Sequence, residues 1–433
     1  MASDLAYGLL PDHLLLALVL VLMLLETVGA TERLASLLLR LALLAGCAVL
    51  WQQLATGYAA EPLPGEIGID RFALLAKLVI LACGLLWSLV FPGGTYKSAL
   101  LAGSSLLGAL VIMDSAGFIL LFLGIEMLSL PAFALIVHGA GRGTAAEGAF
   151  KYLLLSAVAS ASMLFGIALG YGVTGSLAIA PFAEAVRAGA PPAVAAGLLV
   201  ASGLFLKAAV FPFHGWAPDA YSGARLHVTG LLASIVKGTV ILALVRIFGT
   251  VGLNAETTAV VVVLAMLSIF YGNFAAIKQR SFKRLIAYSS IAHAGYMVFA
   301  LVDTTGSRAS DLLWYVAIYA STVIVACAAF AVLCPGEGDD VQALDGAFGA
   351  RPVTALVFGL AMLSLAGIPP LPGFFAKLFV FTSVVASGYL AAAAVAFVGS
   401  FIGVTYYLAL SFRLFAGDAH TAPAERVPTR GGS

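Results

Sequence analysis

The stretch Phe205-Leu-Lys-Ala-Ala-Val-Phe-Pro-Phe-His-Gly-Trp-Ala-Pro-Asp219 places a lysine inside a long apolar run and then interrupts the run with two prolines. A lysine at bilayer depth costs about 3 kcal/mol on insertion scales, so it needs a compensating reason to be there. Irregular backbone at that depth is tolerated only where it is buried in protein or lines a wet cavity. The stretch therefore predicts a discontinuous helix beside a buried charge, the combination from which transporters build ion sites.

A second stretch, Gly367-Ile-Pro-Pro-Leu-Pro-Gly-Phe-Phe-Ala-Lys377, repeats this combination of prolines and a lysine within an apolar run. Broken helices at corresponding positions of two halves point to a midplane ion pathway. Each stretch would belong to a unit of five spans, and the two units start in opposite orientations because five is odd. The predicted division is an N-terminal three-helix segment, two inverted five-helix repeats and a polar C-terminal tail, at residues 1–96, 97–250, 251–416 and 417–433.

The composition places the chain in a membrane. Of its 433 residues, 62% are hydrophobic and only 10% are charged, whereas soluble domains carry about 25% charged residues. A net charge of +1 gives no electrostatic basis for binding nucleic acid or another highly charged partner. The lipid bilayer is therefore the predicted surrounding, and nucleic acid is not among the predicted partners.

Thirteen apolar windows are long enough to cross about 30 Å of hydrocarbon. They fall at 12–30, 33–51, 72–91, 97–113, 117–138, 147–173, 192–220, 226–249, 256–277, 283–302, 309–334, 352–387 and 389–416. The windows that contain Pro212 and Pro369 are too long for one straight crossing, and each is interpreted as one discontinuous span. For 352–387, two separate short helices are the alternative. The predicted fold class is an all-α polytopic membrane protein with about 13 transmembrane helices.

The basic residues orient the chain, because lysines and arginines gather in cytoplasmic loops. Alternate loops and the tail hold thirteen of them, namely Arg33, Arg40, Lys97, Arg142, Arg225, Lys278, Arg280, Lys283, Arg284, Arg351, Arg413, Arg426 and Arg430. The opposite face holds four, namely Arg71, Arg187, Arg246 and Arg308. This bias predicts a periplasmic N-terminus and a cytoplasmic C-terminus.

Five lysines remain within the apolar windows, namely Lys77, Lys151, Lys207, Lys237 and Lys377. The last three each lie ten or more residues from the nearest end of their window, too deep for their ammonium groups to reach the interface. Lys77 lies near a span start and is expected to snorkel to the interface. Lys151 either snorkels in the same way or belongs to a polar patch with Glu147 and Tyr152.

Glu126 is the acidic residue that matches these deep lysines. It lies mid-span in Phe122-Leu-Gly-Ile-Glu-Met-Leu-Ser-Leu-Pro131, where the proline removes a helical hydrogen bond. One interpretation of a lone acid at this depth is a protonated structural hydrogen-bonder. With three deep lysines in the same chain, a charge partnership is the more economical interpretation.

Two histidines are candidates for relaying protons between these charges. His293 lies on a polar stripe, Tyr288-Ser-Ser-Ile-Ala-His-Ala-Gly-Tyr296, and His214 lies at the first helix break. A reference pKa of about 6.5 suits histidine to proton transfer. The alternative for each is a core histidine whose ring is simply hydrogen-bonded.

The four cysteines, Cys47, Cys83, Cys327 and Cys334, stand singly within apolar runs. They form neither a Cys-x-x-Cys pair nor a cluster with histidine, the spacings from which iron–sulfur, haem and zinc sites are built. No cofactor and no metal is therefore predicted, and each cysteine is interpreted as a small core residue.

Five motifs of the chain resemble the antiporter-like proton channel family of respiratory complex I. They lie at 123–131, 150–156, 211–221, 283–296 and 365–377, and the resemblance covers nearly the whole chain. It implies two inverted five-helix bundles, each with a discontinuous helix, in a bacterial inner membrane. It also implies a non-redox, proton-translocating subunit of an NADH–quinone oxidoreductase, surrounded by other membrane subunits, with quinone reduced elsewhere in the complex.

The family's functional residues fall on charges already singled out. The glutamate of its fifth span matches Glu126, the lysine of its first broken helix matches Lys207, and its central lysine of span 8 matches Lys237. The lysine of its second broken helix matches Lys377. The resemblance implies that these four residues translocate protons, with Glu126 and Lys207 as a switchable ion pair, Lys237 as the central proton carrier and Lys377 as the gate of the other half-channel. Lys151, His214 and His293 are further relay candidates.

Two features depart from the family pattern. Typical members of the family's N type have a fourteenth span, whereas this chain is expected to end after the thirteenth. The family's loop Gly-Ala-Pro-Thr-Pro before span 8 is here Gly-Ala-Arg225-Leu-His227. Two other assignments stay open: a membrane subunit of an energy-converting hydrogenase or formate hydrogenlyase-like complex, and a component of a multi-subunit sodium/proton antiporter.

Overall fold

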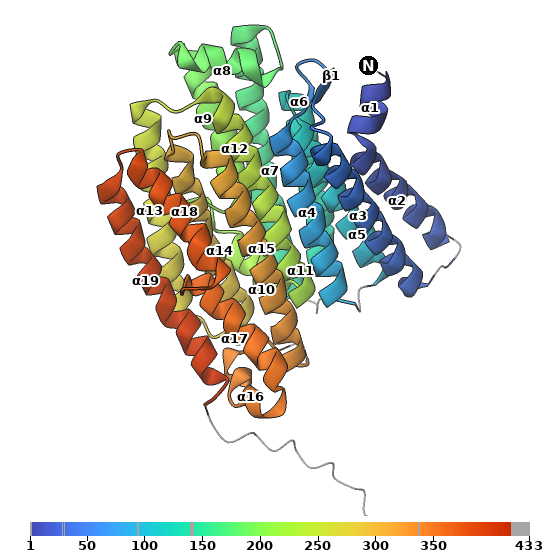
Figure 1. The fold of residues 1–433 in the computed structure, drawn as a ribbon, viewed down its shortest axis with the longest axis vertical. Coiled ribbons are helices and arrows are strands. Elements are labelled where there is room, and N and C mark those ends of the chain that lie inside the picture. Colours follow the sequence, from blue (N-terminus) through green and yellow to red (C-terminus); the bar gives the residue numbers. More distant parts are fainter. Residues whose placement is uncertain are drawn as a thin grey trace, which may run out of the picture.

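The computed structural model describes residues 2–27, 29, 31–92, 95–138, 143–336 and 338–416. Figure 1 shows an elongated helical bundle, with the N-terminal helices in blue on one flank and the C-terminal helices in red on the other. Arg142 and the polar tail 417–433, which entered the predictions of orientation and division, lie outside the described residues.

The elements follow one another in three groups along the chain. The first group is α1 (Ala2–Gly8), α2 (Leu10–Thr27), α3 (Glu32–Ala55), β1 (Ala60–Leu63), β2 (Ile67–Ile69) and α4 (Arg71–Val90). The second is α5 (Tyr96–Asp114), α6 (Phe118–Val137), α7 (Thr144–Thr174), α8 (Ile179–Arg187), α9 (Pro191–Lys207), α10 (Ala217–Gly223), α11 (Leu226–Leu231), the π-helix η1 (Leu232–Val236) and α12 (Lys237–Val251). The third is α13 (Ala255–Ile277), α14 (Phe282–Phe299), η2 (Ala300–Val302), α15 (Arg308–Leu333), η3 (Val341–Leu344), α16 (Ala347–Ala350), α17 (Pro352–Ala366), α18 (Pro372–Ala386) and α19 (Leu390–Arg413).

Long apolar helices occupy most of the predicted windows. Among the described residues, eleven helices are long and apolar enough to cross a membrane. The other two windows contain the interrupted pairs α9/α10 and α17/α18. The helices α17 and α18 have 15 residues each, or about 22 Å at 1.5 Å per residue, which is too short to cross about 30 Å alone. These lengths favour one discontinuous span for 352–387.

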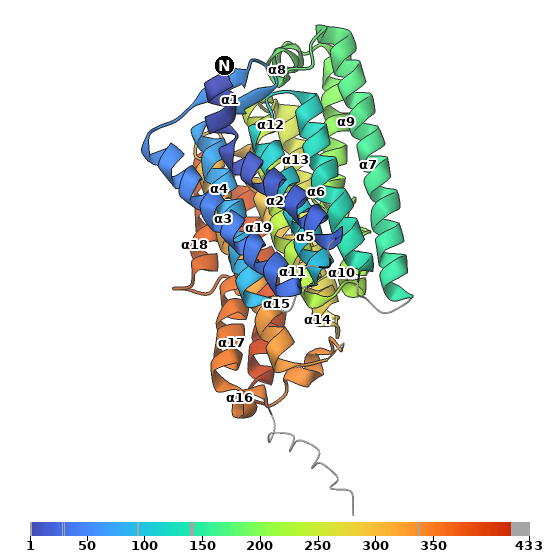
Figure 2. The same ribbon diagram turned by 90° about the vertical axis from the view of Figure 1, so that its right-hand side faces the viewer.

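Short elements outside the windows escaped the sequence prediction. The antiparallel hairpin β1–β2 joins α3 to α4, and the carbonyl of Glu66 accepts hydrogen bonds from the backbone of Ala116 and Gly117. The hairpin is thereby attached to the turn between α5 and α6. Figure 2 shows α1 and α8 at this same end of the bundle and α16 at the opposite end. We call these the hairpin end and the α16 end.

Close packing of α5 against α6 fixes the position of the helix that carries Glu126. A Cβ atom added to Gly108 of α5 would lie 2.4 Å from the backbone nitrogen of Leu128 on α6, and one added to Gly124 would lie 2.9 Å from that of Ile112. Small residues allow helices to approach closely where lipid supplies no hydrophobic drive. Larger side chains at these two glycines would push α6 away from α5.

The first helices of the two predicted repeats run in opposite directions. Beyond the end of α5, the carbonyl of Ser115 accepts a hydrogen bond of 2.7 Å from Nε of Arg246, near the end of α12. Since α13 starts just after α12, it begins at the hairpin end, where α5 finishes. The pairings α5/α6 and α7/α9 recur as α13/α14 and α15/α17. On this basis we propose the inverted repeats 97–250 and 251–416.

Candidate functional site

Lys207 and Glu126 form an ion pair inside the bundle. Lys207 is the last residue of α9 and is 4% exposed, and its Nζ lies 3.2 Å from Oε1 of Glu126 on α6. The ammonium also donates to Ser129 at 3.1 Å and to Ser156, while Ser160 donates to the same glutamate oxygen at 2.5 Å. The side chain of Glu126 is 24% exposed, so the pair joins a deeply buried cation to a less enclosed acid.

The break after Lys207 is stabilised by side chains from elsewhere in the bundle. The indole Nε1 of Trp216 donates to the carbonyl of Leu206 at 2.7 Å. The backbone nitrogen of Phe211 donates to Oγ of Ser268 at 2.9 Å. Because backbone groups at this depth must find partners within the protein, these two contacts allow α9 to stop at its lysine.

Lys237 starts α12 immediately after the π-helical turn η1 and is 1% exposed. Single π-turns inside helices occur frequently at functional sites. The ammonium donates to Oγ of Ser290 on α14 at 2.6 Å. Among the described residues, no carboxylate forms an ion pair with it. Loss of its proton would therefore leave no carboxylate unpaired.

Lys377 lies in α18 with its ammonium turned towards the end of α17. It donates to the carbonyl of Ala366 and to Oγ of Ser400, both at 2.9 Å, and lies 5.1 Å from the ring centroid of Tyr296. The carbonyl end of a helix and the face of an aromatic ring both attract a cation. Gly367, at φ 84°, leaves the space that this side chain fills, because an added Cβ would lie 3.1 Å from its Cδ.

The family resemblance implies that Lys377 exchanges protons, so we expect a complex with the Lys377→Arg variant to pump protons poorly. The guanidinium is larger than the ammonium and permanently charged, so it can neither fit against Gly367 nor release a proton. The rate of proton translocation in vesicles that contain the intact complex should fall by about tenfold or more, since positioned proton-transfer groups contribute about 10²–10⁴-fold. Wild-type pumping by the arginine variant would reduce the role of Lys377 to positive charge alone.

His293 is a buried, hydrogen-bonded histidine, one of the two interpretations that the sequence allowed. Its Nδ1 lies 2.9 Å from the hydroxyl of Tyr315, and its Nε2 lies 3.3 Å from that of Tyr407. The ring is therefore hydrogen-bonded at both nitrogens. It also lies within electrostatic range of both Lys377 and Lys237.

His214 lies in the break between α9 and α10. Its ring stacks on Phe211 with centroids 5.2 Å apart, and the ring of Tyr271 is 4.3 Å away. In the part of the chain that the structure describes, its buried Nδ1 has no hydrogen-bond partner. The ring also lies within electrostatic range of Lys237.

Lys151 belongs to a polar patch at the surface of the bundle. Its ammonium lies 2.6 Å from Glu147 and 2.6 Å from Asp219, and Asp219 also pairs with Arg284 at 3.2 Å. The side chain of Lys151 is 42% exposed. Of the two interpretations open for this lysine, the geometry agrees with the patch, and it separates Lys151 from the buried lysines.

The expectation that Lys77 snorkels to the interface is wrong. Its side chain is fully buried, and its ammonium contacts the carboxylates of Asp12 on α2, at 2.6 Å, and Asp114 on α5. The start of α4 looked interfacial in the sequence, but α2 and α5 flank it here and supply two acids. Neither aspartate was among the predicted functional residues, because each lies at the end of a helix where an exposed acid is ordinary.

The contacts divide the predicted residues into groups. Glu126 meets Lys207, His293 is held by Tyr315 and Tyr407, and Lys151 lies apart in its patch. No hydrogen bond or ion pair joins Lys207 to Lys237 within the described ranges. A proton that passes between these two lysines would need intervening water or a movement of the side chains.

Two cavities with charged linings lie at opposite ends of the bundle. The cavity at the α16 end, about 510 Å³, is lined by Arg225, Lys283 and Asp339 among others. The cavity at the hairpin end, about 550 Å³, is lined by residues that include Arg246 and Asp303. Charged walls favour water, so both cavities suit water molecules.

The described residues contain no group of three or more His, Cys, Asp or Glu side chains that could hold a metal ion. The four cysteines are free, and three of them are buried. The side chains that accept hydrogen bonds from Lys207, Lys237 and Lys377 are serine hydroxyls and the carboxyl group of Glu126.

Comparison with known proteins assigns the family. The family model described as NADH:quinone oxidoreductase/Mrp antiporter, transmembrane, matches residues 115–403, a range that includes both broken helices together with Glu126 and the three buried lysines Lys207, Lys237 and Lys377. The chain belongs to this family. It is 56% identical to NADH-quinone oxidoreductase subunit N of Pelobacter propionicus, over 97% of this chain and 91% of that protein.

Solved structures show the same architecture in two respiratory assemblies. A chain of respiratory complex I from Thermus thermophilus with bound aureothin matches with a TM-score of 0.83 and 33% identity, over 94% of this chain and 90% of that one. A chain of the membrane-bound sulfane sulfur reductase, an archaeal respiratory membrane complex, matches with a TM-score of 0.87 and 26% identity, over 97% and 91%. These likenesses bear out the predicted class, an all-α polytopic membrane protein.

Proposed function

We propose that this chain is a proton-translocating membrane subunit of an NADH–quinone oxidoreductase. The observation that carries the proposal is the set of ionisable side chains in the bundle interior, namely Glu126, Lys207, Lys237 and Lys377. Ionisable groups within membrane spans mark ion pathways and proton relays. Their place beside broken helices is typical of transporters, in which such breaks surround the ion site.

In this proposal the chain performs no redox chemistry and carries no cofactor of its own. Quinone is reduced elsewhere in the complex, and neighbouring membrane subunits together with lipid surround the bundle. The subunit counts as part of an oxidoreductase because its proton movement is coupled to that reaction. The ionisable side chains Glu126, Lys207, Lys237 and Lys377 support a role in proton movement, while quinone reduction takes place in other subunits.

The ion pair of Glu126 and Lys207 acts as a switch in the first half of the path. While the pair is closed, the carboxylate offsets the cost of the buried ammonium. When Lys207 moves away from Glu126 towards Lys237, two ammonium groups approach each other and their repulsion favours loss of a proton from Lys237. Closing of the pair removes the repulsion and lets Lys237 take up another proton.

The second half of the path leads from Lys237 to Lys377. Lys237 gives its proton to water or to His293, whose imidazole accepts on one nitrogen and donates from the other. The hydroxyl groups of Tyr315 and Tyr407, bonded to that ring, keep it in place. Lys377 then controls the exit from this half. His214 and Lys151 serve as relays nearer the first break and the bundle surface.

We also propose the orientation that the basic residues indicate, in a bacterial inner membrane. The N-terminus would be periplasmic and the C-terminus cytoplasmic, which places the hairpin end outside. A reporter enzyme that works only in the cytoplasm should be active when it is fused after Ser433. Activity of a periplasm-specific reporter at the same position would reverse the orientation or change the number of crossings.

Purification of the intact complex tests the proposed function. The proteins that copurify should include NADH-binding and quinone-reducing subunits, and the complex in vesicles should move protons when it oxidises NADH. The likeness to the sulfane sulfur reductase complex favours one alternative, a membrane subunit of another ion-coupled redox complex. Copurification with a hydrogenase or sulfur-reducing module, without NADH-binding subunits, would establish that alternative.

A further inference from the structure

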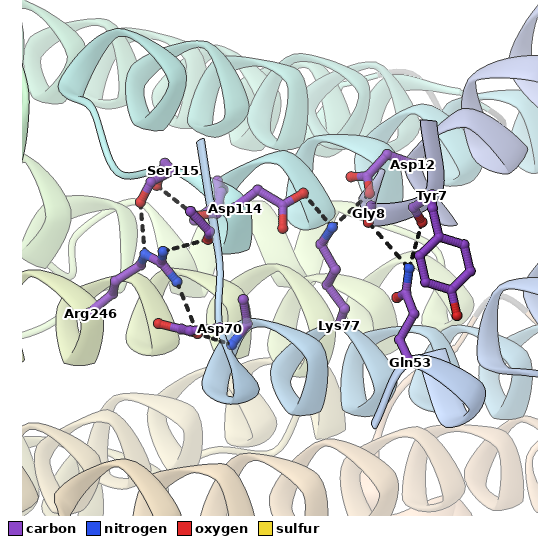
Figure 3. A network of polar contacts seen from close by, with 12 residues as sticks. Tyr7, Gly8, Asp12, Gln53, Asp70, Lys77, Asp114, Ser115 and Arg246 are labelled. Carbon is purple, nitrogen blue, oxygen red and sulfur yellow. Dashed lines mark hydrogen bonds and ion pairs between the residues drawn. The ribbon is translucent and has the colours of Figure 1, made fainter. Parts of the chain in front are cut away.

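Asp12, Lys77 and Asp114 form a buried cluster outside the proposed path. Figure 3 shows the ammonium of Lys77 between the two carboxylates, which come from α2 and α5. The side chain of Lys77 is not exposed at all, that of Asp114 is 2% exposed and that of Asp12 is 10% exposed. Three helices of the N-terminal segment and the first repeat therefore meet at one ammonium.

The charges of this cluster do not cancel if all three groups are ionised. Two carboxylates and one ammonium give a net charge of −1 in a site almost without solvent. An uncompensated charge is very costly in an apolar interior, and a buried group commonly neutralises instead. Two carboxylates that share one site also resist ionising together. One proton on the pair of acids removes both costs and leaves a neutral cluster.

A second observation points to the same proton. Oδ1 of Asp12 and Oδ1 of Asp114 are both buried, and neither has a hydrogen-bond partner among the described residues. The amide of Gln53 on α3, shown beside the cluster in Figure 3, donates instead to the carbonyls of Tyr7 and Gly8. Either of these two unpartnered oxygens can carry the proton, because neither is needed for a hydrogen bond from Lys77.

The cluster lies next to a cavity. Asp114 is followed by Ser115, which lines the cavity at the hairpin end together with Arg246 and Asp70. Arg246 donates to the carbonyl of Ser115 at 2.7 Å and lies 3.6 Å from Asp70. The guanidinium of Arg246 on α12 lies within electrostatic range of Asp114, and these contacts hold it at the cavity wall.

We propose that Asp12, Lys77 and Asp114 form a second proton-binding centre, which holds one proton on its two carboxyl groups at neutral pH and exchanges it with the cavity at the hairpin end. On release, the O–H bond of the carboxylic acid breaks, its electrons stay on the carboxylate, and the proton passes to a water molecule. The cluster then changes from neutral to a charge of −1. The centre is independent of the path through Glu126, Lys207, Lys237 and Lys377.

Infrared spectroscopy of the purified intact complex, labelled with [4-¹³C]aspartate, tests this centre. At pH 7 the wild type should show an isotope-sensitive carboxylic acid band that disappears as the pH rises. Asp12→Asn and Asp114→Asn should each remove that band, because the remaining aspartate is then neutralised by Lys77 as a carboxylate. Asp340→Asn is the control, an exposed aspartate at the opposite end of the bundle, and should leave the band unchanged.

A band that persists in either asparagine variant, or spectra that match between wild type and both variants at every pH, contradict the proposal. In that case the cluster is a fixed anchor for three helices. Should an asparagine variant fail to assemble, Asp12→Glu and Asp114→Glu keep the charge. In these variants part of the isotope-sensitive band should move to the frequency of unlabelled glutamic acid, and an unchanged band would again overturn the proposal.

Discussion

Glu126→Gln and Lys207→Met should each reduce turnover of the complex by about tenfold or more, since positioned proton-transfer groups contribute about 10²–10⁴-fold. Each substitution also leaves one buried group without its ionic partner, and an uncompensated charge in the membrane interior is costly. The geometry behind this expectation is the distance of 3.2 Å between Nζ of Lys207 and Oε1 of Glu126.

The double variant Glu126→Gln/Lys207→Met should be less impaired than the sum of the two single effects. The interaction energy of groups in contact is about 0.5–3 kcal/mol. A double-mutant cycle, built from the rates of NADH oxidation per assembled complex, should show an interaction energy of this size. Glu147→Gln, which removes an exposed acid from the patch around Lys151, is the control and should be additive with Lys207→Met. Strict additivity of the Glu126 and Lys207 substitutions would mean that the switch does not exist.

Lys237→Met should lower coupled turnover by a similar factor, about tenfold or more, in a complex of normal subunit content. Methionine is close to lysine in length and apolar, so it fits the buried position without a charge that needs a partner. The hydroxyl of Ser290, the partner of Lys237 at 2.6 Å, still has a bond to the carbonyl of Ala287. The matched control is Lys278→Met, an exposed lysine at the end of α13, which should behave as wild type.

Loss of assembly in Lys237→Met would instead assign the lysine a structural role. The two cases are separated by the amount of each subunit in the purified complex. Full turnover together with normal assembly would remove Lys237 from the proton path altogether.

The sequence was sufficient for the class of fold and for the two helix breaks. Prolines beside a lysine in an apolar run have few stable arrangements in a membrane. This combination, at Lys207 and at Lys377, therefore predicted the broken helices α9/α10 and α17/α18. The hairpin β1–β2 and the short α8 escaped prediction because they are brief, partly polar segments between strong apolar signals. The π-turn η1 before Lys237 was not predicted either, since its residues Leu232–Val236 have the sequence pattern of an ordinary α-helix.

Composition and spacing alone could not say which charges meet, because that depends on helix packing. Glu126 needed a cation, and the family resemblance selected Lys207 from the three deep lysines; the structure agrees, with the two groups 3.2 Å apart. Lys77 was misread because of helix packing, as its depth along α4 is small while α2 and α5 enclose it from the sides. Asp12 and Asp114 could have been suspected as its partners, since both lie at span ends on the same side of the predicted topology.

The most direct test of the account is the initial rate of proton translocation per assembled complex, measured with a pH-sensitive dye in sealed vesicles. Wild type, Lys237→Met and Lys278→Met are compared at saturating NADH and quinone, with a protonophore to define zero. The account predicts that Lys237→Met pumps at most about a tenth as fast as wild type and that Lys278→Met pumps normally. Equal rates in all three would contradict the claim that this chain carries protons through its buried lysines.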